Sequence, residues 1–181
     1  ALQADSVLFT SVDSSLGWGK IQFRNYARDD ISFIQNSIIE GADAGVYCES
    51  ASPTINQNII RNNTDGVEAD GGSIPIISNN TFINNHRPVA IQAYNVDNNI
   101  YGNTYAQNFT SGTTISSNYI YTYNNDRLAQ NKTYDWLADG APYRITENLW
   151  VWENDDNNEV AILKLYPGVT MAFDPGVILY I

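Results

Sequence analysis

The chain has 181 residues, of which 20 are acidic and 9 basic, so its formal net charge at pH 7 is −11. Such an acidic chain repels nucleic-acid phosphates, and we expect no nucleic-acid partner. No apolar run approaches the roughly 18 residues of a membrane-spanning helix, and no basic-then-apolar leader opens the sequence, so we expect neither a membrane span nor an uncleaved signal peptide.

Asparagine and isoleucine are both abundant, with 23 and 20 copies. Helices disfavour β-branched residues and asparagine, whereas strands and turns accept them. Apolar residues make up 43% of the chain, enough for a buried core. We therefore expect an all-β protein with short strands and many turns. Cys48 is the sole cysteine, which excludes an internal disulfide, and we expect it to be a small apolar filler of the core.

A repeat runs along the chain and is the main structural signal. Residues 1–30 are expected to form its first one or two units. The pattern apolar, two variable, Asn, one variable, apolar then occurs in five copies, the first at Phe33–Ile38. The asparagines follow one another at spacings of 22, 22, 23 and 15 residues: Asn36, Asn58, Asn80, Asn103 and Asn118. A second apolar strand lies between copies, as in Gly45–Cys48 and Gly66–Ala69.

A unit of about 22 residues is too short for a helix-containing repeat or a propeller blade. It fits one coil of a parallel β-helix, in which each coil stacks on the last about 4.8 Å further along the axis. Parallel crossovers are almost always right-handed. The sequence therefore predicts an all-β, right-handed parallel β-helix.

The repeated asparagines have a physical explanation in such a fold. Asparagine tolerates the left-handed bend between two strands, and stacked amides can hydrogen-bond to one another along the axis. A ladder of this kind would satisfy polar groups that are otherwise expensive to bury. The alternative, that these are merely exposed turn residues, explains the composition but not the apolar partners at fixed positions.

Three segments are expected along the chain. Residues 1–125 form the coils, and residues 126–142 form a linker in which the periodicity stops. Residues 143–181 are a strand-rich segment that completes the β-helix or continues it onto the next copy. Within that segment, residues 153–159 read as a polar, hairpin-like loop.

The coil pattern of residues 5–125 resembles a known family, and so does Leu163–Phe173, which contains a Pro-Gly-Val motif. Both resemble the secreted right-handed parallel β-helix proteins of the pectate-lyase-like superfamily, with the Asn-rich coils of many surface proteins. In such proteins the Pro-Gly-Val strand usually opens the module, whereas here strands like its successors, Ala1–Ala4 and Val7–Ser11, come first. The chain, which starts at Ala1 as a mature or excised piece would, thus reads as one period of a longer array.

Two carboxylates are expected on the outer face of successive coils. Strand alternation exposes Glu49 and Asp70, about 5 Å apart, with Arg24 on the preceding coil. Such a pair suits a shared Ca²⁺ ion or a carboxylate pair that acts on a glycosidic bond. The resemblance implies the same, because acidic-polysaccharide lyases of this fold carry Ca²⁺-binding acids and a basic residue on an outer face. The alternative is a solvated charged face in which Arg24 offsets Glu49.

Other candidate sites are weaker. The polar loop offers a second possible Ca²⁺ site through Glu153, Asp155, Asp156 and Glu159. His86, the sole histidine, has no Cys or His partner in the sequence and is expected in a surface turn. Among the Asn-x-Ser/Thr sequons, we expect surface glycans at Asn108 and Asn131.

Two functions from different classes remain open. The first is an extracellular or cell-surface structural module, not an enzyme and without a cofactor, that assembles head to tail with copies of itself into a filament, stalk or array. It is favoured because the catalytic motifs of pectin hydrolases are missing and neither end carries a polar cap. The expected interface residues are Leu2, Val7, Phe9, Val169, Met171, Phe173, Val177, Leu179 and Ile181. The second is a carbohydrate-binding or polysaccharide-cleaving module that uses the Glu49 and Asp70 face.

Overall fold

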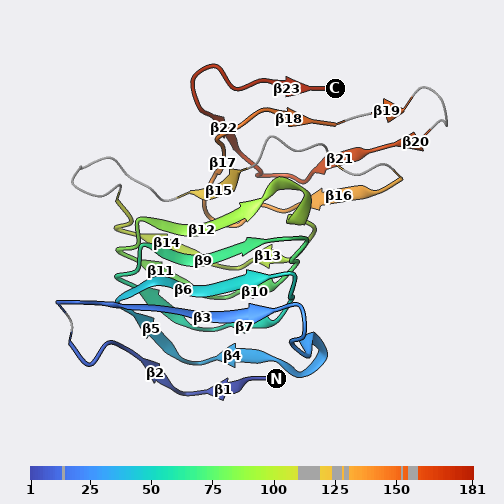
Figure 1. The fold of residues 1–181 in the computed structure, drawn as a ribbon. Coiled ribbons are helices and arrows are strands. Elements are labelled where there is room, and N and C mark those ends of the chain that lie inside the picture. Colours follow the sequence, from blue (N-terminus) through green and yellow to red (C-terminus); the bar gives the residue numbers. More distant parts are fainter. Residues whose placement is uncertain (14, 110–118, 124–127, 129–130, 152, 155–158) are drawn as a thin grey trace.

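The structure is a computed structural model of the whole chain. It describes residues 1–181 except 14, 110–118, 124–127, 129–130, 152 and 155–158. Nearly all the regular structure is strand, and two short 3-10 turns, η1 (Asp29–Ile31) and η2 (Ala93–Asn95), lie at coil corners. Figure 1 shows the strands stacked in layers, with the two termini at opposite ends of the stack.

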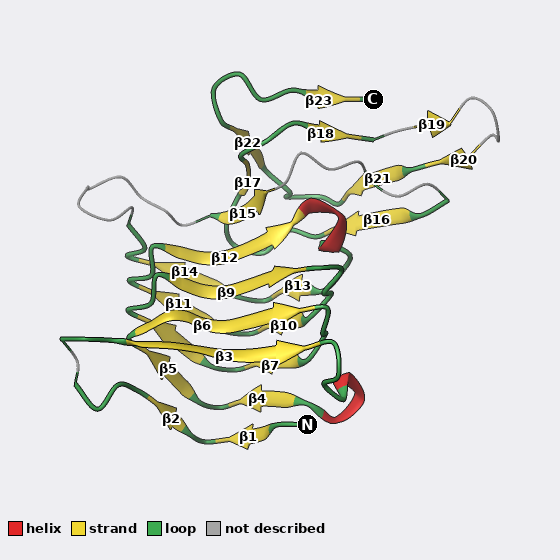
Figure 2. Cartoon of the chain, in the orientation of Figure 1, coloured by secondary structure: helices red, strands yellow, loops and turns green. Residues whose placement is uncertain are grey.

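Parallel pairing builds three sheets along the axis, which Figure 2 shows as stacked arrows. We call them sheets A, B and C. The strands of sheet A are β1 (Gln3–Asp5), β4 (Phe33–Gln35), β7 (Thr54–Asn56), β10 (Ile76–Ser78) and β13 (Ile100–Tyr101). Those of sheet B are β2 (Leu8–Phe9), β5 (Ile38–Glu40), β8 (Ile59–Arg61), β11 (Thr81–Ile83) and β14 (Thr104–Ala106). Those of sheet C are β3 (Trp18–Arg24), β6 (Ala42–Glu49), β9 (Asp65–Asp70), β12 (Arg87–Gln92), β15 (Ile120–Tyr123), β17 (Tyr143–Ile145) and β22 (Met171–Phe173).

Each regular coil contributes one strand to each sheet in the order A, B, C, and pairs in parallel register with the coils above and below. The first coil, for example, contains β1, β2 and β3. This confirms the predicted parallel β-helix.

The core consists of inward-facing side chains stacked in columns. One column of sheet A contains Ile34, Ile55, Ile77 and Ile100, all 0 or 1% exposed. Sheets B and C add similar columns of Ile, Val and Phe, and burial of this apolar area is the main stabilising term. Cys48 lies in the same core, and burial raises the pKa of its thiol.

The C-terminal coils differ from the prediction. Residues 126–142 contain a strand, β16 (Thr133–Trp136), which pairs in parallel with β21 (Ile162–Leu165). Tyr134 and Trp136 of β16 are 1 and 0% exposed, so β16 is packed into the coil stack within the stretch that was expected to be a linker. Thr133 faces Ile162, 29 residues later, a spacing that the regular repeat of about 22 does not reveal.

Two further pairs of strands lie at the C-terminal end of the stack. Strand β18 (Leu149–Trp150) pairs in parallel with β23 (Leu179–Tyr180), and the Trp150 and Tyr180 rings stack with centroids 4.9 Å apart. Strands β19 (Glu153–Asn154) and β20 (Glu159–Val160) pair antiparallel. The two ends of the polar segment 153–159 therefore pair antiparallel, as expected for the predicted hairpin-like loop.

Candidate functional site

The first asparagine ladder lies at the corner between sheets A and B. The backbone N–H and the Nδ2 of Asn58 both donate to Oδ1 of Asn80, at 2.9 and 3.0 Å, and the Nδ2 also donates to the Ile34 carbonyl at 2.9 Å. Asn80 repeats this pattern toward Asn103. All three side chains are buried, so the ladder satisfies amides that would otherwise destabilise the fold.

The two ends of this ladder differ from the sequence prediction. The rung below Asn58 is Ser37, not Asn36, because the Ser37 N–H donates to Asn58 Oδ1 at 3.0 Å. Asn36 is the preceding residue, with a left-handed φ of 51°, and its amide donates to Asp5 instead. Asn118 lies outside the described residues.

Asp139 occupies the rung after Asn103. Its carboxylate accepts the Asn103 N–H and the Asn103 Nδ2, each at 2.8 Å, and the Tyr105 hydroxyl at 2.6 Å. Burial raises the pKa of Asp139, although these three hydrogen bonds oppose the shift. No part of the repeat pattern points to an acid at this place.

A second ladder, missed from the sequence, lies at the corner between sheets B and C. Asn63 donates from its N–H and Nδ2 to Asn85 at 3.1 and 3.0 Å, and Asn85 donates to Asn108 at 2.8 and 3.3 Å. The signal was present in the pairs at 62–63 and 84–85, which repeat at 22 residues.

This ladder also corrects one glycan prediction. Asn108 is 0% exposed and its Nδ2 donates to the Phe82 carbonyl, so it is closed to a glycan. Asn131 is exposed, and a glycan there stays a prediction.

The acidic face lies on the outside of sheet C. Glu49 and Asp70 face each other in register, as expected. Arg24 Nε lies 3.0 Å from a Glu49 oxygen that also accepts from Gln22 at 2.9 Å, and the Tyr47 hydroxyl donates to Asp70 at 2.7 Å. The Arg24–Glu49 pair has the geometry that the charged-face interpretation requires.

Further charges border this face. Burial raises the pKa of Glu68, and the neighbouring Asp65 adds to the shift. Asp65 itself forms two hydrogen bonds to the Arg87 guanidinium, each 2.6 Å long. The described residues contain no group of three or more His, Cys, Asp or Glu side chains arranged to hold a metal ion. In the second possible Ca²⁺ set, Asp155 and Asp156 lie outside those residues, while Glu153 and Glu159 lie in β19 and β20.

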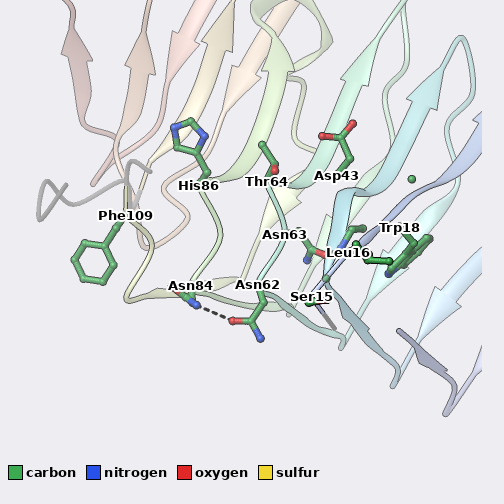
Figure 3. A pocket seen from close by; sticks show the side chains of 14 residues that line it. Ser15, Leu16, Trp18, Asp43, Asn62, Asn63, Thr64, Asn84, His86 and Phe109 are labelled. Atoms are coloured by element: carbon green, nitrogen blue, oxygen red, sulfur yellow. Dashed lines mark hydrogen bonds between the residues drawn. The ribbon is translucent and has the colours of Figure 1, made fainter. Parts of the chain in front are cut away.

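A groove of about 830 Å³ follows the corner between sheets B and C (Figure 3). Trp18 and Phe109 lie at its two ends, and polar side chains lie between them. His86, expected in a surface turn, is one of these polar residues and is half-buried.

The two ends of the stack expose apolar side chains. Of the nine residues predicted for an interface, six are partly buried against the core: Leu2, Phe9, Val169, Met171, Val177 and Leu179. Val7, Phe173 and Ile181 are 38, 42 and 98% exposed. They belong to opposite ends of the stack, at β1–β3 and at β21–β23 (Figure 1).

Comparison with protein families matches residues 16–161 to the family described as right-handed beta helix region. No curated protein and no solved structure matches the chain. Among the described residues, no helix is long and apolar enough to cross a membrane. The match covers most of the chain and agrees with the stacked parallel sheets, so this chain belongs to the right-handed β-helix family.

Proposed function

We propose that the chain is a structural module that stacks end to end with further copies of itself, outside the cell, as part of a filament, stalk or surface array. Membership of the family gives the fold and assigns no activity. The proposal does not include catalysis, because Arg24 already neutralises Glu49, one of the two candidate acids.

One observation carries the proposal: an inward-facing column that is buried within the stack becomes exposed at the end formed by β22. In sheet C, one such column reads Ile91, Thr122, Ile145 and Phe173, with exposures of 0, 2, 1 and 42%. A further coil on β22 would cover Phe173 as β22 covers Ile145. Exposed apolar surface next to unpaired strand edges favours association.

The direction of the strands supports a head-to-tail contact. All seven strands of sheet C are parallel, with β3 at one edge and β22 at the other. A second copy in the same orientation can place its β3 on β22 and continue the parallel sheet. A two-fold dimer would instead bring identical edges together with strands antiparallel, so the favoured contact is heterologous and propagates.

The resemblance seen in the sequence supports the same partner. In β-helix proteins that the chain resembles, the Pro-Gly-Val strand precedes strands like those at residues 1–11. Here Pro167–Val169 leads into β22 at one end of the stack, and β1 lies at the other. Stacked copies would restore the usual order across each junction.

The test blocks each end separately. Val7→Lys and Phe173→Lys place a charge at the two ends, and Ile76→Lys is the matched control, since Ile76 is 40% exposed on the side of sheet A. Light scattering and negative-stain microscopy should show concentration-dependent elongation for the parent chain and the control, and monomers for each end variant. A mixture of the two end variants should stop at dimers, because each supplies one intact end. A monomeric parent chain, or elongation unaffected by both end variants, would refute the proposal.

A further inference from the structure

The groove at the corner between sheets B and C is built from two rows of polar side chains that follow the axis. Asp43, Thr64 and His86 occupy equivalent positions on three successive coils, just before or at the start of the sheet C strands. Asn62 and Asn84 form the second row, one per coil (Figure 3). A ligand in this groove therefore meets one pair of polar groups with every step of about 4.8 Å.

These polar groups have unused hydrogen-bonding capacity. Asn84 Nδ2 donates to Asn62 Oδ1 at 2.7 Å, and the Asn62 Nδ2 makes no hydrogen bond to the described part of the chain. The Thr64 hydroxyl, the Asp43 carboxylate and the His86 ring likewise make none to the residues that the structure describes. Asp43, Thr64, Asn62 and Asn84 are exposed.

The backbone beneath the groove is already occupied. The N–H groups of Ala42, Asn63 and Asn85 donate to the next amide of the second ladder, at 2.9, 3.1 and 2.8 Å. An extended peptide binds a sheet mainly through main-chain hydrogen bonds. This corner therefore suits a ligand that is recognised by side chains.

Aromatic rings close both ends of the row. The Trp18 ring is fixed, because its Nε1 donates to the Glu40 carbonyl at 2.8 Å. Phe109 is 42% exposed. They lie on the first and fifth coils, so four steps, or about 19 Å, separate them along the axis. Flat apolar rings beside a few polar groups form the usual lining of a site for an amphipathic ligand.

We propose that this groove binds a linear, uncharged oligosaccharide that lies along the stack axis. Hydroxyl groups on successive sugar rings match the amide, hydroxyl, carboxylate and imidazole groups that recur once per coil. The C–H faces of the terminal rings match Trp18 and Phe109. The described lining residues include no Lys or Arg, and Asp43 adds a negative charge, so the groove disfavours uronic-acid chains. The site lies on the side of the stack and does not depend on contacts between copies.

The experiment measures binding by calorimetry and by saturation-transfer NMR. The probes are cellohexaose, xylohexaose and mannohexaose, with hexagalacturonate as the charged comparison and an uncharged polyserine peptide as the peptide comparison. In the double variant Asn62→Gly/Asn84→Gly, glycine keeps the left-handed φ of 58° and 53° while both amides are removed. The matched control is Asn36→Gly/Asn79→Gly, the same change at left-handed positions of the corner between sheets A and B.

We expect at least one neutral hexaose to bind the parent chain and the control equally. The groove variant should lose roughly tenfold or more in affinity, the effect expected when hydrogen-bond partners of a bound ligand are removed. Thermal melts of both variants confirm that they are folded. The proposal is overturned if no neutral hexaose binds, if binding survives in the groove variant, or if hexagalacturonate or the peptide binds as tightly.

Discussion

At the scale of single residues, the end of the first ladder is the most unusual place. Asp139 is a buried carboxylate at the position where the repeat would put another asparagine. Its pKa is raised by burial in the folded state. A carboxyl whose folded pKa lies above its unfolded value contributes stability that is fully present below the unfolded pKa. That contribution is lost as the pH rises through the folded pKa.

Replacing Asp139 with Asn should therefore remove a pH dependence without breaking the ladder. The new Oδ1 can accept both bonds from Asn103, as Asn80 does for Asn58, and its Nδ2 can donate to the Tyr105 hydroxyl oxygen. We expect Asp139→Asn to be at least as stable as the parent at pH 7, with the advantage shrinking toward pH 4. Urea unfolding at the two pH values measures this. Asp139→Leu, which accepts nothing, should lose about 1–3 kcal/mol, and equal losses in both variants would contradict the ladder role.

The inner rungs should be more sensitive than the turn residues beside them. Asn58→Leu or Asn80→Leu leaves the neighbouring amides buried without a partner, and we expect each to lower the free energy of unfolding by about 1–3 kcal/mol. Asn36→Gly, at an exposed left-handed position, should change it by well under 1 kcal/mol. Chemical denaturation compares the variants. Unchanged stability in both leucine variants would show that the ladder does not contribute to the free energy of unfolding.

The sequence pattern predicted Asn36 as a ladder residue, whereas Ser37 occupies that rung, and this error has a physical cause. Each corner has two adjacent positions that favour asparagine: the first needs a left-handed φ, and the second supplies the ladder amide. At 79–80 both are asparagine, and the spacing to the apolar neighbours selects the second. At 36–37 the pair is Asn-Ser, and Phe33 and Ile38 flank Asn36 at the same spacing as the true pattern. At 36–37, sequence spacing alone therefore cannot tell the left-handed position from the ladder position.

At the scale of elements, the regular strands and the strand-rich segment 143–181 were predictable, and strand β16 was not. Strands in coils of about 22 residues repeat an apolar pattern that can be read from the chain. Strand β16 pairs with β21 across a longer period, because the β19–β20 hairpin extends that coil. The groove between sheets B and C was not predictable either, since its lining comes from five coils and depends on how their corners align.

The outer face of sheet C leads to a prediction about calcium. Glu49 Oε2 accepts from both Arg24 and Gln22, and Asp70 Oδ2 accepts from Tyr47, so one oxygen of each carboxylate remains for a cation that takes six to eight. We expect millimolar CaCl₂ to leave the melting temperature of the parent and of Glu49→Gln/Asp70→Asn equally unchanged. A rise in the parent that the double variant lacks would establish a Ca²⁺ site here and revive the polysaccharide-cleaving alternative.

At the scale of the whole molecule, stacking of copies predicts a gain in stability on covalent linkage. Two copies joined directly from Ile181 to Ala1 would bury side chains such as Phe173 and Phe9 at the junction. Full burial of one large apolar side chain contributes about 1.5–3 kcal/mol. We expect the fused pair, at a concentration where single copies do not associate, to melt at a higher temperature than one copy.

The control for this fusion carries Phe173→Lys in the first copy and Val7→Lys in the second, at the internal junction. It should melt like a single copy, because the charges prevent the coils from closing on each other. A fused pair without these substitutions that also melts like a single copy would show that the junction does not form.

The ladder amides all point the same way. In each rung the amide oxygen accepts from the coil nearer the N-terminus, and the Nδ2 donates one hydrogen to the coil nearer the C-terminus and the other to a carbonyl of the preceding coil. Aligned bond dipoles of this kind add along a line, as they do in an α-helix. The row from Asn58 to Asn103 therefore has a small net dipole, and its positive end faces the Asp139 carboxylate. We therefore expect a longer row of rungs to favour the ionised form of Asp139, against the burial that raises its pKa.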